Sequence, residues 1–117
     1  MKPDNVIQNK SYDFALRIVK VYKYLSQEKK EFVLSKQLLR CGTSVGANIE
    51  EAIGGQSKAD FFAKLTISYK EARESKYWIR LLRDSDYLTM EQSADLLKDV
   101  EELLRIIGSI QKSIRNS

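Results

Sequence analysis

Apolar side chains recur along this chain at the three- and four-residue spacing of amphipathic helices. In the first such segment, residues 10–25, the apolar positions are Phe14, Ile18, Val21 and Leu25. Segments with the same periodicity cover residues 31–54, 57–84 and 89–114. The pattern predicts an all-α protein of four helices. Residues 5–9 are too few to assign, and an extended lead-in is one alternative for them.

The three later segments each carry one inward stripe. The predicted core positions are Leu34, Leu38, Cys41, Val45, Ile49 and Ala52, then Phe61, Leu65, Ser68, Ala72, Ser75, Ile79 and Leu82, and finally Leu96, Val100, Leu103, Ile107, Ile110 and Ile114. Ser57 with Asp60, and Thr89 with Gln92, have the spacing of helix N-caps. Short connections favour antiparallel neighbours, so residues 1–117 are predicted to form one up-down-up-down antiparallel four-helix bundle.

Two glycines lie four residues apart inside the second predicted helix. Each glycine costs a helix roughly 1 kcal/mol relative to alanine, so tertiary packing must offset the loss. Gly42 and Gly46 share a face with Val45 and Ile49, which allows a neighbouring backbone to approach closely. The small residues in the middle of the third stripe suggest that the third helix makes this approach.

Composition excludes most catalytic and metal chemistry. The chain has no histidine and one cysteine, which rules out a closed zinc site, a Glu-x-x-His di-iron set and a histidine-assisted nucleophile. We therefore expect no enzyme activity, no cofactor, no metal and no small-molecule substrate. No stretch has the length of a membrane span and no signal-peptide pattern follows Met1, so a cytoplasmic location is expected.

Three polar or reactive side chains have structural interpretations. Cys41 lies on an apolar stripe and is predicted to be a core residue. Glu71 is flanked by Lys70 and Arg73, which favours an ion-paired structural or interface residue over a catalytic acid. Asn48 is expected to make a packing or capping contact.

Basic side chains form two rows. In the third helix Arg73, Lys76, Arg80 and Arg83 fall within an arc of about 80°, with Tyr69 on the same face. In the first helix the row is Lys10, Arg17 and Lys20, beside Tyr24. Cations interleaved with aromatic rings can neutralise phosphates and stack on bases, although such rows also occur as plain solvated surface. The net charge of +4 indicates only a weak general attraction to polyanions.

The third and fourth helices carry more apolar residues than one stripe needs. The surplus is either a wide core or an oligomer interface, and we predict an interface because exposed apolar patches are a liability for a monomer. The predicted interface residues are Ile67, Trp78, Leu81, Leu97 and Leu104.

Four ordered sequence blocks resemble the bacterial 23S rRNA intervening-sequence proteins. They are residues 10–15 (KSYDFA), 42–52 (GTSVGANIEEA), 57–61 (SKADF) and 70–78 (KEARESKYW). The resemblance implies a four-helix bundle assembled as a homopentamer and brings no catalytic residues. Similarity to the accessory variability proteins of diversity-generating retroelements implies a basic surface for RNA or DNA.

Two hypotheses follow from the residues and the resemblance together. The first is a non-enzymatic homo-oligomer that binds RNA or DNA through its basic helix faces. The alternative is a protein-interaction scaffold with no nucleic-acid role, whose cationic rows serve solubility.

Overall fold

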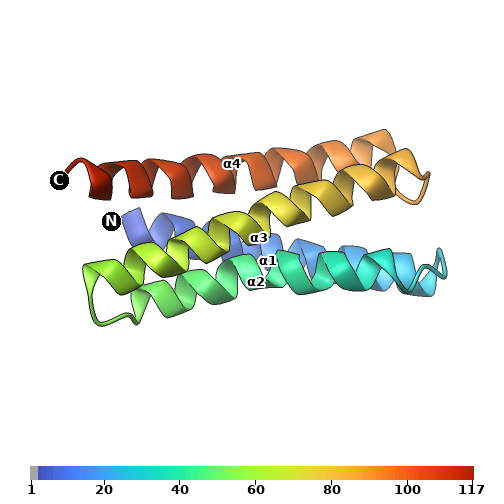
Figure 1. Cartoon of the computed structure of the whole chain (residues 1–117). Helices are drawn as coiled ribbons and strands as arrows, with labels where there is room; N and C mark the ends of the chain where they lie inside the picture. Colours follow the sequence, from blue (N-terminus) through green and yellow to red (C-terminus); the bar gives the residue numbers. More distant parts are fainter. Residues whose placement is uncertain (1–2) are drawn as a thin grey trace.

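A computed structural model describes the backbone of residues 3–117 and the side chains of residues 6–117; Met1 and Lys2, which the predicted domain includes, lie outside the described residues. The helices are α1 (Pro3–Gln27), α2 (Leu34–Ile53), α3 (Lys58–Asp84) and α4 (Met90–Arg115). The chain reverses direction after each helix, so the start of α1 and the end of α4 lie at the same end of the bundle (Figure 1). The predicted all-α four-helix bundle is confirmed.

Each helix packs against two others. α2 and α4 both lie between α1 and α3, so α1 and α3 are diagonal across a bundle of 46 × 22 × 21 Å. The packing of α2 on α3 is the most extensive, and that of α1 on α4 is the least. Any surface shared by α3 and α4 is therefore opposite the surface shared by α1 and α2.

The predicted stripes form the core. Most of their members are buried, and Val21, Leu34, Phe61, Ile110 and Ile114 are partly buried at its margin. Small residues bring α3 close to α2, where the hydroxyl of Ser68 donates to the carbonyl of Val45 at 2.8 Å. None of the described helices combines the length and apolar content of a membrane span.

Polar side chains cap the helices. The Ser57 and Thr89 hydroxyls each accept a hydrogen bond from the backbone N–H three residues later, at 3.0 Å, and Thr89 with Gln92 completes a capping box. The Glu31 carboxylate accepts from the N–H groups of Leu34 and Ser35 at 3.0 and 2.7 Å. α2 consequently begins at Leu34 rather than near Glu31, which lies outside the helix as its capping group.

α1 is helical from Pro3, earlier than the predicted start at residue 10, so residues 5–9 are not an extended lead-in. Ile7 is 1% exposed and Ser11 is equally buried, so both continue the inward face of Phe14. Proline is favoured in the first turn of a helix, where no backbone N–H is needed. The buried face of α1 therefore extends further toward the N-terminus than the pattern predicts.

The expected partner of Gly42 and Gly46 is also wrong. A Cβ on Gly42 would lie 2.8 Å from Cγ1 of Ile18, and one on Gly46 would lie 3.3 Å from the carbonyl oxygen of Ser11. Both contacts are with α1. The glycines therefore permit the close approach of α1, while Ser68, Ala72 and Ser75 serve the same purpose between α3 and α2.

Candidate nucleic-acid interface

The predicted basic row of α3 is divided between paired and free cations. Lys76 Nζ lies 2.5 Å from Glu101 Oε1 of α4, and Arg83 Nε lies 2.8 Å from Oδ1 of its neighbour Asp84. This contact raises the pKa of Arg83 and lowers that of Asp84, mainly through the hydrogen bond between them. Arg73 and Arg80 are exposed and form no ion pair within residues 6–117.

The Lys76–Glu101 ion pair fixes which residues of α4 adjoin this row. Arg73 and Arg80 lie three residues before and four after Lys76, on its side of the helix. On α4, Lys98 lies three residues before Glu101 and Arg105 lies four after it. Because the helices are antiparallel, these offsets from the ion pair put Arg105 near the height of Arg73 and Lys98 near the height of Arg80. Arg105 also lines a hollow with Val6 of α1. We call these six residues the α3–α4 patch: Arg73, Lys76, Arg80, Lys98, Glu101 and Arg105.

Sequence reasoning missed Lys98 and Arg105, both of which are exposed. Asp99 and Glu102 lie between them in sequence, so the summed charge of this segment gives no sign of a cationic face. In the structure these two carboxylates face α1. Sorting the charges of residues 90–115 by helix face, rather than adding them, is the signal that would have found the cations.

The predicted row on α1 lies at a different place and is largely neutralised. Lys10 Nζ is 3.2 Å from Glu102 Oε1 and Arg17 Nη1 is 2.8 Å from Asp99 Oδ2. Lys20 is exposed and lines a groove of about 350 Å³ between α1 and α4. The α1 row faces one side of α4 and the α3 row the other. The two predicted sets therefore do not merge into one surface.

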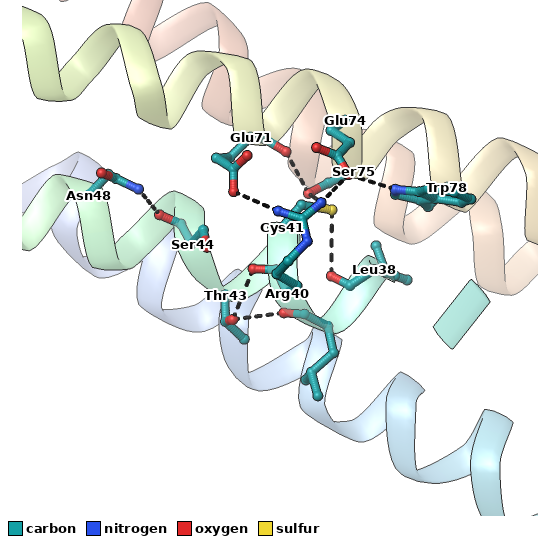
Figure 2. A network of polar contacts seen from close by, with 11 residues as sticks. Leu38, Arg40, Cys41, Thr43, Ser44, Asn48, Glu71, Glu74, Ser75 and Trp78 are labelled. Atoms are coloured by element: carbon teal, nitrogen blue, oxygen red, sulfur yellow. Dashed lines mark hydrogen bonds and ion pairs between the residues drawn. The ribbon is translucent and has the colours of Figure 1, made fainter. Parts of the chain in front are cut away.

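The third polar cluster lies between α2 and α3 (Figure 2). The guanidinium of Arg40 forms ion pairs with Glu71, at 3.4 Å, and with Glu74. Trp78 Nε1 donates to Glu74 Oε2 at 2.9 Å, which extends the network along α3. Glu71 is thus an ion-paired side chain that holds two helices together, as predicted.

Cys41 has the core position that the sequence predicts, whereas Asn48, within the described residues, neither caps a helix nor forms a hydrogen bond to another helix. Cys41 is fully buried, with its Sγ 3.3 Å from the hydroxyl of Ser75. Burial raises the pKa of the Cys41 thiol to about 11, so the thiol is protonated and a weak nucleophile at neutral pH. The Asn48 amide donates to the carbonyl of Ser44, one turn earlier in the same helix, at 2.9 Å.

The predicted interface residues differ in the surface they offer. Ile67 is 43% exposed, whereas Leu104 is 8% exposed and belongs to the core. Trp78 and Leu97 are partly buried and pack against the same core, and Leu81 is partly buried as well. Much of the apolar surplus is thus a wide core, and Ile67 is the member with the most surface available to a second copy.

Comparison with known proteins identifies the family. The sequence profile of the 23S rRNA-intervening sequence proteins matches residues 3–109. The chain belongs to this family. Among curated proteins, none matches the chain.

A crystal structure of a similar protein supports the fold of this chain. It is that of a protein with unknown function from the S23 ribosomal protein family of Bacteroides thetaiotaomicron VPI-5482. The two chains are 51% identical, the match covers 95% of this chain and 99% of the other, and the TM-score is 0.93. At this identity and TM-score the two chains share the arrangement of the four helices.

Proposed function

We propose that this chain is a non-enzymatic nucleic-acid-binding bundle that holds phosphates on the α3–α4 patch and acts as a homo-oligomer. The observation that carries the proposal is the gathering of four exposed cations from two helices around one ion pair. Like charges so placed repel one another, and a bound polyanion removes that cost. Membership of a family named for an insertion in 23S rRNA makes RNA the first partner to test.

The spacing of the cations suits a phosphate backbone. Arg73 and Arg80 are seven residues apart, as are Lys98 and Arg105. Seven residues span about 10.5 Å of helix, so the two cations of each helix can contact separate phosphates of one strand. Four such contacts give affinity with little direct reading of sequence.

Self-association would strengthen the same surface. A symmetric oligomer repeats each patch in every subunit, so one nucleic acid could engage several patches at once. Avidity of this kind compensates for a modest charge of +4 per chain. The pentamer implied by the family resemblance is the assembly that we propose.

The test is a titration of a labelled RNA at several salt concentrations. The probe is a 16-nucleotide strand of adenine and cytosine, alone and annealed to its complement. Four phosphate contacts predict a slope of about −3 in log affinity against log salt for the single strand. Arg73→Glu/Arg80→Glu should weaken binding at least about 10-fold at 100 mM salt.

The matched control reverses two charges on the opposite helices. Lys23 and Lys36 are exposed residues of α1 and α2, and Lys23→Glu/Lys36→Glu changes the net charge by the same amount. At 100 mM salt charges are screened beyond about 10 Å, so this control should bind nearly as the wild type does. Equal losses in both variants, or a wild type that binds neither probe at 50 mM salt, would overturn the proposal and leave the scaffold hypothesis.

A further inference from the structure

An exposed aromatic ring lies within the cationic surface of α3. Tyr77 is 54% exposed and follows Arg73 by four residues and precedes Arg80 by three. This spacing puts the three side chains on one face of the helix. Tyr69, the aromatic residue that the sequence pattern places in this row, is partly buried and packs against the core beside α4. Tyr77 is therefore the aromatic side chain that the patch presents to solvent.

The ring of Tyr77 is held by its neighbour. It meets the indole of Trp78 edge to face, with centroids 5.0 Å apart and an interplanar angle of 77°. The hydrogen bond from Trp78 to Glu74, and the ion pair of Glu74 with Arg40, fix the indole in turn. A ring supported in this way loses less conformational freedom when a ligand stacks on it.

An exposed aromatic ring between two arginines is the combination of side chains found at binding sites for single-stranded nucleic acid. Aromatic side chains stack on bases of any identity, but only when the face of the base is free. In a duplex each base is stacked between its neighbours, and the protein meets phosphates and groove edges instead. We infer that the α3–α4 patch selects unpaired over paired nucleic acid, with one base stacked on Tyr77. This inference rests on the proposed phosphate-binding function of the patch.

The experiment compares two probes and one side chain. The 16-nucleotide strand and its duplex are titrated against wild type, Tyr77→Leu and Tyr77→Phe. Tyr77→Leu should weaken binding of the strand about 5- to 10-fold and that of the duplex less than about twofold. Tyr77→Phe keeps the ring and should retain the affinity. The slope against salt should stay unchanged, because no phosphate contact is lost.

Tyr12→Leu is the matched control, since Tyr12 is 63% exposed on α1 and lies outside the patch. It should leave both affinities unchanged. Trp78 is the only tryptophan of the chain, so its fluorescence should report the strand in wild type and respond less in Tyr77→Leu.

The outcomes separate the two proposals. The stacking inference is overturned if Tyr77→Leu binds the strand with wild-type affinity, or if its affinities for strand and duplex fall by the same factor. Either result leaves the phosphate-binding proposal standing. A wild type that binds neither probe overturns the proposed function itself. Circular dichroism and light scattering of each variant verify that helix content and assembly are unchanged in the comparison.

Discussion

Gly42 of α2 leaves no room for a side chain against Ile18 of α1. A Cβ at this position would lie 2.8 Å from Cγ1 and 2.9 Å from Cγ2 of Ile18, which is itself fully buried. A branched side chain locked in the core cannot move aside at little cost. The helix-weakening glycine is therefore required by the distance between α1 and α2.

Substitution at Gly42 should destabilise the bundle even though it improves helix propensity. Gly42→Leu forces α1 and α2 apart, and we expect the free energy of unfolding to fall by about 2 kcal/mol or more in a chemical melt. Gly108→Ala is the matched control, because its Cβ would lie 3.9 Å from Tyr69, an ordinary contact. It should stabilise by up to about 1 kcal/mol. A Gly42→Leu protein as stable as wild type would refute the close approach.

The capping carboxylate of Glu31 should give the bundle a pH-dependent stability. Although burial opposes ionisation, hydrogen bonds from the N–H groups of Leu34, Ser35 and Val33 lower its pKa below the ordinary 4.5. The stabilisation is thus complete above pH 4.5 and is lost as the pH falls through the lower folded-state value.

Replacing this carboxylate isolates its contribution. Glu31→Gln should cost about 1 kcal/mol at pH 7, and the difference from wild type should shrink as the pH falls below 4.5. Urea melts across this pH range measure both quantities. A difference that stays constant with pH would show that the charge of Glu31 does not cap α2.

Much of the fold is predictable because each signal is local. The core stripes, the caps at Ser57 and Thr89 and the short connections are written in adjacent residues. The partner of Gly42 is not local, since glycine spacing shows that some backbone approaches but not which one. The rotation of α2 about its axis decides this, and it places Cys41 toward α3 and Gly42 toward α1.

The candidate site is only half predictable for a similar reason. The row of α3 is visible as a sequence period, but its effective charge depends on contacts with distant residues, such as that of Lys76 with Glu101. Lys98 and Arg105 join the row of α3 only because of the antiparallel register of α4 against α3. That register comes from packing, which no single segment contains.

The proposed assembly predicts a solution mass several times that of the 117-residue chain, and five times if it is the pentamer. Ile67→Glu should reduce the mass in light scattering while helix content is kept, because a charge at an exposed apolar contact is costly when a second copy covers it. Ile67 is a cleaner probe than Trp78, whose indole also supports the monomer.

Leu16→Glu is the control for this measurement. Leu16 is 49% exposed on α1, outside the predicted interface. Its substitution should leave the mass unchanged. A wild-type protein that is monomeric at micromolar concentration would remove both the assembly and the avidity argument.

The most direct test of the central claim is a gain of affinity. Glu101→Gln removes the acidic side chain at the centre of the α3–α4 patch and frees Lys76, so binding of the 16-nucleotide RNA strand at 100 mM salt should tighten about threefold. Glu28→Gln makes the same charge change between α1 and α2 and should have no effect. Glu101→Gln binding that is no tighter than wild type, with the helices intact, would contradict a phosphate-binding role for this surface.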